Sequence, residues 1–426
     1  MVGFFTLLVK VASLSKELVV AYLFGTGDTL DAFLIAYLVP SFVVLIIAGA
    51  FKPAVVPTYI QVRDQESPEA AQELLSDLLF ITLALLVAMT ALLAAIGPYL
   101  LTLLGSGFNE QKTIISQNLL WILLPLVILG GLQTIYSSIL NAGESFAVAA
   151  YSPAVVPIAS ILILVLLAPN LGIYSLAIGF LVGFALQVLI LALCLKKRKI
   201  SLKPKWTGMN PAVRQVIDQY LPMAAGAFLI SSNFLVDQSM AAMLGSGSVA
   251  ALSYSNKVTA TLLGVGAMAL GTAVLPYYSK MVAKQDWDGI HHTLKTYRWK
   301  VLQVAIPVTL LLFFLSEPLI RILFERGAFT EADTVLVGWT QAMYVLQIPF
   351  YVLNILAVRL VSSLKYNKLL LYGNMISLPL NIILNYLLMK VMGIAGIALS
   401  TSLVYAVSFV FLSVGLQRKL NSLRPA

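Results

Sequence analysis

Residues 2–24 read VGFFTLLVKVASLSKELVVAYLF, an apolar run that contains Lys10, Lys16 and Glu17. About 20 apolar residues in a helix span the ~30 Å hydrocarbon core of a bilayer, so this run predicts a transmembrane helix. A cation at membrane depth costs at least about 2.5–3.5 kcal/mol and usually faces a water-filled interior. The run therefore indicates a transport pathway that carries positive charge, which suits an anionic cargo.

Similar apolar runs fill the rest of the chain, of whose 426 residues 60% are hydrophobic and 11% are charged, with a mean hydropathy of +0.94. A soluble fold does not need so much apolar surface. The alternating strands of a membrane barrel are absent, and the first run lacks the cleavage site of a signal peptide, so we expect it to be retained. We expect an all-α integral membrane protein with about 12 transmembrane helices, at residues 2–24, 29–50, 76–104, 116–140, 146–168, 172–195, 215–244, 247–279, 299–320, 334–358, 368–389 and 393–416.

Most lysines and arginines fall on one side of the predicted membrane. With a cytoplasmic N-terminus, the cytoplasmic connections hold the basic residues of 52–63, 196–214, 280–300, 359–368 and 418–424. The opposite side holds only Lys112, Arg321, Arg326 and Lys390. Because cytoplasmic loops are enriched in Lys and Arg, we expect both termini to be cytoplasmic. The excess positive charge, a formal net charge of +9, then lies along the inner leaflet. This distribution gives no indication of nucleic-acid binding.

A basic run in the middle of the chain, KKRKISLKPK at 196–205, also contains a proline. We interpret residues 201–205 as a cytoplasmic linker between an N-lobe, 1–200, and a C-lobe, 206–426. Four short matches at an offset near 220 indicate a duplication: LFGTG at 23–27 with MLGSG at 243–247, VPTY at 56–59 with LPYY at 275–278, GFNE at 107–110 with AFTE at 328–331, and LGI at 171–173 with MGI at 392–394. Since each half has an even number of helices, we expect two parallel six-helix lobes around a central cavity.

The charged residues of the first helix are candidates for a substrate site. Lys10 and Lys16 are six residues apart, about 240° around a helix, so they do not share one narrow face. Two other interpretations stay open. Glu17 could neutralise Lys16 in a structural ion pair. The long aliphatic side chain of Lys10 could instead carry its ammonium group to the cytoplasmic interface.

Two more candidate positions lie in later helices. Asp31 begins the second helix on the expected outer side, where helix capping or dipole pairing explains a carboxylate as well as transport does. Asn256 and Lys257 lie well inside the eighth predicted helix, and the acidic residue nearest to them in sequence is Asp237. We interpret Lys257 as a cation that lines a cavity, with an ion pair as the alternative.

Asp237 lies inside the seventh predicted helix, where a buried carboxylate must find a cation or take up a proton. Asn381 and Asn385 share a face of the eleventh helix, and Thr401 lies on the next helix. Oxygen ligands of this kind suit Na⁺, whereas amides that join helices explain the same residues. We expect a candidate sodium site here, with Na⁺ or H⁺ coupling and no other cofactor.

The chain offers little for catalysis. Its only histidines, His291 and His292, are adjacent in a cytoplasmic connection, and its single cysteine, Cys194, ends a predicted helix. Metal-ligand spacings, a Walker loop and a nucleotide fingerprint are all absent from the sequence. The sequence therefore predicts a transporter and not an enzyme.

Several short motifs follow one another along the chain: ELVVAYLFGTG at 17–27, TLDAF at 29–33, VPS at 39–41, AGAF at 48–51, NK at 256–257, ALGT at 269–272 and LFERGAFT at 323–330. Together they resemble a known family, the MviN/MurJ lipid II flippases. The resemblance implies the fold of the multidrug/oligosaccharidyl-lipid/polysaccharide exporter superfamily. It also implies a cargo of polyprenyl-pyrophosphate-linked sugar, moved to the outer leaflet of the bacterial inner membrane for peptidoglycan and cell-wall synthesis.

The resemblance also assigns positions. Arginine is usual in the family where this chain has Lys10, Lys16 and Lys257, and the family is acidic at Glu17 and Asp31. The candidate sodium ligands resemble those described for the fold, although the position of Asn385 can be acidic.

Two departures concern the cargo. Val43 and Val44 replace an arginine pair, and twelve helices are expected here where the family commonly has fourteen. Lysine is not equivalent to arginine at a bidentate diphosphate site. The cargo could therefore be another cell-surface or exopolysaccharide precursor.

These observations predict a flippase for lipid II or a related sugar lipid that works by alternating access. Lys16 and Lys257, with Lys10 assisting, would attract the diphosphate, and we expect the protein to act as a monomer among membrane lipids. A cation-coupled multidrug exporter has the same plan, but its cationic cargo favours a carboxylate-rich cavity. A non-transporting membrane scaffold is the alternative from another class.

Overall fold

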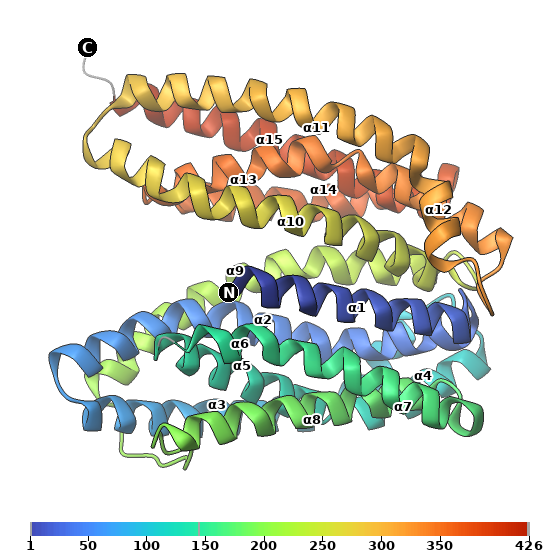
Figure 1. The fold of residues 1–426 in the computed structure, drawn as a ribbon, viewed down its shortest axis with the longest axis horizontal. Helices are drawn as coiled ribbons and strands as arrows, with labels where there is room; N and C mark the ends of the chain where they lie inside the picture. Colours follow the sequence, from blue (N-terminus) through green and yellow to red (C-terminus); the bar gives the residue numbers. More distant parts are fainter. Residues whose placement is uncertain (1, 144, 424–426) are drawn as a thin grey trace. The chain divides into compact units, whose positions relative to one another are not determined.

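The computed structural model describes residues 2–143 and 145–423, and within them it gives no side-chain environment for residues 2 and 265–276. The described chain consists of helices and short connections, and no strand is assigned in it (Figure 1). Residues 275 and 276 of the second VPTY-like match lie outside the described side chains. The chain divides into two compact units, Met1–Ser231 and Ser232–Ala426.

Unit 1 contains the first eight α-helices, one short 3₁₀ helix and the first part of a ninth α-helix. Their bounds are α1 Val2–Phe24, α2 Asp28–Gln65, α3 Pro68–Leu104, α4 Glu110–Leu123, α5 Leu126–Ala142, α6 Phe146–Tyr151, η1 Ser152–Ala154, α7 Val155–Leu171, α8 Tyr174–Lys197 and α9 Pro211–Ala242.

Unit 2 contains the rest of α9 and the helices that follow it. Their bounds are α10 Ser248–Ala283, α11 Trp287–Phe324, α12 Glu331–Val345, α13 Ile348–Ser363, α14 Lys368–Met392 and α15 Ile394–Leu423. The two units divide inside α9, between residues 231 and 232. The boundaries of the functional lobes, expected at 200 and 206, stay predictions.

Each of the twelve predicted segments corresponds to one helix or one interrupted helix of this set, and none extends more than two residues beyond it. Within the described residues, eight helices are long and apolar enough to cross a membrane, or nine if the bent pair α4 and α5 counts as one span. α1 is not among them, since Lys10, Lys16 and Glu17 place three charges in its 23 residues. The charges that mark α1 as a functional candidate thus also make it a less apolar span.

Three predicted helices are interrupted where the sequence analysis expected continuous ones. The segment 146–168 is divided by the 3₁₀ turn η1, and the segments 116–140 and 334–358 are each divided into two α-helices. α4 and α5 meet at an angle of 42°, and Pro125 is the N-cap of α5. α12 and α13 are separated at the matching place in unit 2, where Pro349 lies in the first turn of α13. Proline lacks the amide proton and clashes with the preceding turn, so it favours a new helix start over continuation.

Several helices are longer than the sequence analysis expected. α2 continues to Gln65, beyond the predicted end at 50, and α11 begins at Trp287, before the predicted start at 299. The Asp286 side chain accepts a hydrogen bond from Gly289 N at 2.9 Å and caps α11. Apolar runs identify only the part of a helix that lies in hydrocarbon, which explains why these polar extensions were missed.

The connection between α8 and α9, residues 200–210, is not helical and is fixed to α3. Asp77 on α3 is fully buried and accepts hydrogen bonds from Thr207 N at 2.6 Å, Thr207 Oγ1 at 2.7 Å and Asn210 Nδ2 at 3.4 Å. Gln72 on α3 both donates to Ser201 O and accepts from Ser201 N, each at 2.9 Å. These bonds attach the connection to unit 1 along most of its length.

Candidate functional site

Lys16 and Glu17, adjacent on α1, form an ion pair inside unit 1. Lys16 Nζ lies 2.7 Å from Glu17 Oε1, and the two side chains are only 11% and 9% exposed. The Lys16 ammonium also lies 4.5 Å from the centroid of the Phe180 ring on α8, a cation–π distance. The ion pair that the sequence analysis kept as an alternative is therefore present.

A pocket of about 320 Å³ lies beside this ion pair. Besides Lys16 and Glu17, the residues that line it include Tyr37, Gln133, Phe180 and Gln187. Gln187 is almost fully buried and donates a hydrogen bond to Ser152 Oγ at 3.3 Å. One cation, two amides and two aromatic rings offer hydrogen-bond donors and ring faces to a polar, negatively charged group, while the Glu17 carboxylate is the partner of the cation in this structure.

Lys10 lies two turns before Lys16 on α1 and is partly exposed. It is not among the residues that line the pocket of Lys16, although its neighbour Val9 is. This agrees with the expectation that the two lysines do not share one narrow face.

Asp31, in the first turn of α2, belongs to a separate ion-pair cluster in unit 1. Its Oδ2 atom lies 2.9 Å from Lys112 Nζ on α4, and Asp28 Oδ1 lies 2.6 Å from the same nitrogen. The Lys112 ammonium is also 4.4 Å from the centroid of the Phe108 ring. The structure therefore places Asp31 against Lys112 and not in the lining of the pocket.

Lys112 is a buried residue that the sequence analysis treated only as an outer-side charge. A signal was available, since Lys112 is the only Lys or Arg between Arg63 and Lys196 and was expected on the same side as Asp31. A carboxylate buried in a helix needs a cation nearby. Few other partners were available to Asp31 in this half of the chain.

Asn256 and Lys257 lie on α10 in unit 2, and both are half-buried. The helix is held here by Ser255, whose Oγ donates to Val337 O of α12 at 3.0 Å. Thr261 Oγ1 donates to the Lys257 carbonyl at 2.8 Å, one turn further along. Lys257 thus projects from a well-anchored stretch of α10.

Asp237 of α9 meets three polar side chains in unit 2, and these are the residues that the sequence analysis grouped with it. Asn381 and Asn385 lie on α14, and Thr401 lies on α15. Asp237 Oδ1 accepts from Asn381 Nδ2 at 3.0 Å and from Asn385 Nδ2 at 2.7 Å, and Thr401 Oγ1 donates to Asp237 Oδ2 at 3.3 Å. Asp237, Asn381 and Asn385 are buried, and Asn385 Oδ1 has no hydrogen-bond partner in the described structure. A buried carboxylate beside an unused amide oxygen fits a small hard cation.

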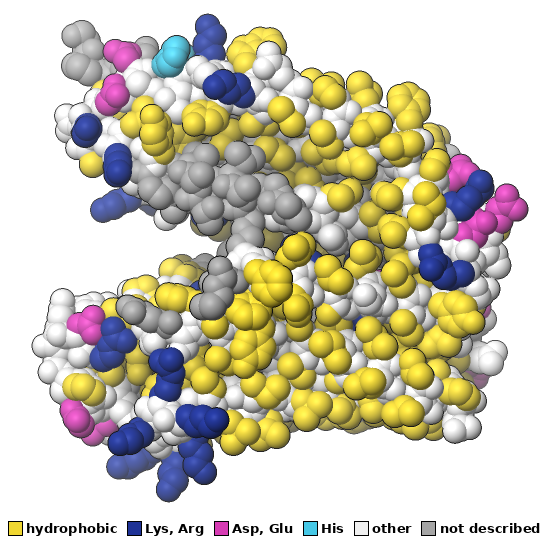
Figure 2. All heavy atoms as spheres, viewed as in Figure 1, with side chains coloured by type: hydrophobic (Ala, Val, Ile, Leu, Met, Phe, Trp, Pro, Cys, Tyr) yellow, Lys and Arg dark blue, Asp and Glu magenta, His cyan; other side chains and the backbone are white. Residues whose placement is uncertain are grey.

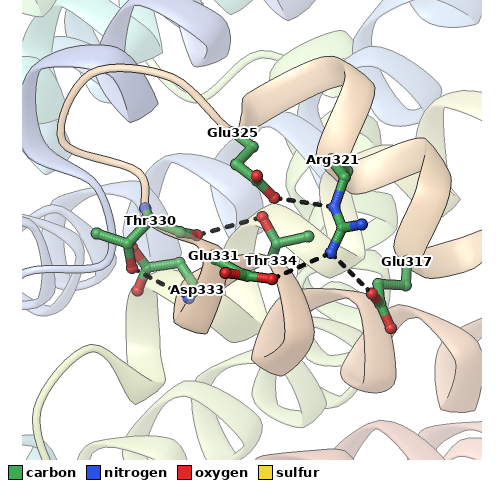
Figure 3. Close-up of polar contacts among 7 residues, drawn as sticks. All are labelled: Glu317, Arg321, Glu325, Thr330, Glu331, Asp333 and Thr334. Carbon is green, nitrogen blue, oxygen red and sulfur yellow. Dashed lines mark hydrogen bonds and ion pairs between the residues drawn. The ribbon is translucent and has the colours of Figure 1, made fainter.

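A fourth polar cluster, which the sequence analysis did not predict, joins the end of α11 to the start of α12 (Figure 3). The Arg321 guanidinium lies 3.2 Å from Glu317, 3.2 Å from Glu325 and 3.7 Å from Glu331. Its side chain is 48% exposed, and exposed ion pairs contribute little to stability. We assign this cluster to the local structure of the turn and not to a binding site.

Comparison with known structures defines the class of protein. The fold matches a solved structure titled "Lipid II flippase MurJ, inward closed conformation" with a TM-score of 0.85 and 26% identity, covering 98% of this chain and 87% of that chain. It also matches an inward-facing multidrug resistance MATE family transporter of the MOP superfamily with a TM-score of 0.85, at 12% identity, covering 97% of this chain and 95% of that one. The chain therefore has the helical fold that these two membrane proteins share.

Sequence comparison gives the family. Residues 20–425 match the family described as "Lipid II flippase MurJ". A probable lipid II flippase MurJ of Vibrio cholerae is 29% identical over 425 residues, covering 96% of this chain and 81% of the relative. A lipid II flippase MurJ of Burkholderia cenocepacia is 28% identical over 438 residues, covering 97% and 82%. This chain therefore belongs to the MurJ family of multi-pass membrane proteins, and the resemblance and all-α membrane fold predicted from sequence are confirmed.

Proposed function

We propose that this protein moves a polyprenyl-pyrophosphate-linked sugar, lipid II or a related cell-surface precursor, across the bacterial inner membrane by alternating access. Membership of the MurJ family supports a lipid-linked cargo. The observation that carries the proposal is the position of Lys16, a buried cation that lines a polar pocket among membrane helices. A charged side chain buried at membrane depth has a high free-energy cost, so it usually marks a site that binds a substrate or an ion.

The pocket of Lys16 suits the diphosphate end of the cargo. A diphosphate oxygen that approaches the ammonium would compete with Glu17, which holds it at 2.7 Å in the structure described. The amide groups of Gln133 and Gln187 would donate to further oxygens, and the rings of Tyr37 and Phe180 offer faces to a sugar. Exchange of one anionic partner for another would keep the lysine paired throughout transport.

The remaining candidates take supporting roles. Lys257, with the Asn256 amide beside it in sequence, would supply a further cationic contact for the cargo, and Lys10 would attract the cargo electrostatically. Asp31 would act through Lys112, by fixing the start of α2 against α4.

A coupling cation would bind at Asp237, Asn381, Asn385 and Thr401. These residues suit Na⁺, because the carboxylate and the hydroxyl supply oxygen ligands and Asn385 Oδ1 is buried without a hydrogen-bond partner in the described structure. The Asn381 oxygen, which accepts a hydrogen bond from Asn385 Nδ2, would exchange that bond for the ion. Proton uptake by Asp237 would serve the same purpose, and in either case the cation would bias the return of the empty carrier.

We further propose that the protein acts as a monomer in the inner membrane, with both termini in the cytoplasm and no nucleic-acid partner. The basic residues gather outside the predicted transmembrane segments, on the side that this orientation makes cytoplasmic.

The test is transport by the purified full chain in lipid vesicles that contain fluorescent lipid II. Lys16→Gln and Lys257→Gln should each slow delivery about 10- to 100-fold, the range for one charge-assisted hydrogen bond. Lys16→Arg should transport, since it keeps the charge, and Lys197→Gln, an exposed lysine at the end of α8, should match the unchanged protein.

Undiminished delivery by the two glutamine variants would reject the proposed role of these lysines. Movement of a cationic dye in place of the sugar lipid would favour the multidrug exporter considered from the sequence. Thermal unfolding of each variant separates loss of binding from loss of structure.

A further inference from the structure

A groove in unit 2, separate from the pocket of Lys16 and the cluster of Asp237, runs between α11 and α15. Its volume is about 380 Å³. The floor is apolar, since Leu416 and Leu420 of α15 are buried in the hydrophobic core of the unit. The rim is basic, and His291, Lys295 and Arg298 of α11 all line the groove.

The basic residues of the rim share one face of α11. Positions 291, 295 and 298 are separated by four and three residues, so their side chains lie one above another on the helix surface. Within the described residues, none of the three forms an ion pair with an acidic side chain. Arg298 instead stacks over the Phe409 ring of α15, at 5.5 Å from its centroid. α15 itself carries no acidic residue.

The groove lies where α11 and α15 pass from hydrocarbon to water. Its residues run from 291 to 302 and from 413 to 420, and the predicted transmembrane segments begin at 299 and end at 416. Trp299, 61% exposed, lies at the rim, and tryptophan is typical of the membrane interface. Figure 2 shows basic side chains gathered at this end of unit 2, beside apolar surface.

We propose that this groove binds an anionic phospholipid of the surrounding membrane. Lys295 and Arg298 would hold the phosphate, and the leucine floor would hold the upper part of an acyl chain. A soluble anion would use the cations but not the apolar floor, whereas a zwitterionic lipid would use the floor but meet less attraction at the rim. On the orientation proposed above, the groove opens to the cytoplasmic leaflet, where anionic lipids attract basic segments.

Trp299 provides a local probe of occupancy. The full chain in neutral detergent would be titrated with phosphatidylglycerol brominated near the head of its acyl chains, and with brominated phosphatidylcholine as the zwitterionic counterpart. Subtracting the signal of Trp299→Phe isolates the quenching of this tryptophan from that of the other four.

Replacement of both cations, Lys295→Gln with Arg298→Gln, should raise the half-quenching concentration of phosphatidylglycerol about 25-fold, roughly fivefold for each basic residue at an anionic surface. The matched control is Lys280→Gln with Lys284→Gln, which removes two exposed cations at the end of α10. The control should leave the titration unchanged, and the exchanged pair Lys295→Arg with Arg298→Lys should retain binding.

A second variant tests the shape of the groove without altering its charge. Ser413→Phe adds a ring to the groove wall and should weaken quenching by both brominated lipids. An equal shift in the control, equal affinity for the two lipids, or displacement of phosphatidylglycerol by millimolar inorganic phosphate would each overturn the proposal. Unchanged thermal unfolding of the glutamine pair shows that its effect is on binding.

Discussion

The ammonium group of Lys112 on α4 lies 2.9 Å from the carboxylate of Asp31 on α2, and the two side chains are only 5% and 0% exposed. Asp28, half exposed, approaches the same ammonium group and completes the cluster. Removal of the cation would leave a buried carboxylate without compensation, which is more costly than the pair is favourable.

Lys112→Met should therefore lower the free energy of unfolding by about 3–5 kcal/mol. Chemical or thermal unfolding in detergent measures this loss. Adding Asp31→Asn to Lys112→Met should recover much of it, because the uncompensated charge is gone. If the single variant is as stable as the unchanged protein, the pair does not hold α2 and α4 together as inferred here.

Asp77→Ala should release the connection between α8 and α9 from α3. The carboxylate accepts three hydrogen bonds from Thr207 and Asn210 while fully buried, and each donor left unsatisfied costs about 1–3 kcal/mol. Faster amide exchange and proteolysis within residues 200–210 would report the release. Glu73→Gln removes an exposed acid from the same helix and should change neither measurement; equal protection in Asp77→Ala would contradict the attachment.

Gly172→Ala and Gly393→Ala should each destabilise the fold by about 1–3 kcal/mol. Both glycines have positive φ, 53° and 59°, and neither has a neighbour that an added Cβ would meet. The cost would thus be conformational. Gly226→Ala, in open surroundings on α9, should instead stabilise by about 0.5–1 kcal/mol, because alanine favours a helix interior. Unfolding experiments on the three variants would show the opposite signs.

Sodium chloride should stabilise the unchanged protein more than choline chloride does. A bound cation adds about 2.7 kcal/mol when its concentration is 100 times the dissociation constant. Asp237→Asn should remove this difference, because it deletes the charge at the centre of the cluster. Asp218→Asn, an exposed acid on the same helix, should keep it. A sodium effect that survives Asp237→Asn would exclude this cluster as the ion site.

The helices were predictable from sequence because a membrane span is a local property. About 20 apolar residues suffice to specify one, and all twelve segments correspond to helices or interrupted helices. The interruption at Pro125 was missed, since hydropathy does not record a lost backbone donor. The early start of α11 at Trp287 was missed because that part of the helix is polar.

The candidate sites were predictable to different degrees. The structure brings Asp237, Asn381, Asn385 and Thr401 into contact, as expected for buried polar groups in a membrane, and their binding of an ion stays a prediction. The partner of Asp31 was not predicted, because Lys112 lies 81 residues away and pairing across helices depends on packing. Whether Lys16 was paired or faced a pocket could not be decided from sequence, and the structure shows both.

The attachment of residues 200–210 to α3 bears on how this protein can be divided. A cut at 201–205 would separate Asp77 from Thr207 and Asn210, so two co-expressed fragments would begin with a broken buried network. A cut in the turn after α9, at 243–247, would keep that network intact. It would also leave Asp237 on one fragment and its three partners on the other, so that reassembly could be followed by recovery of the ion site itself.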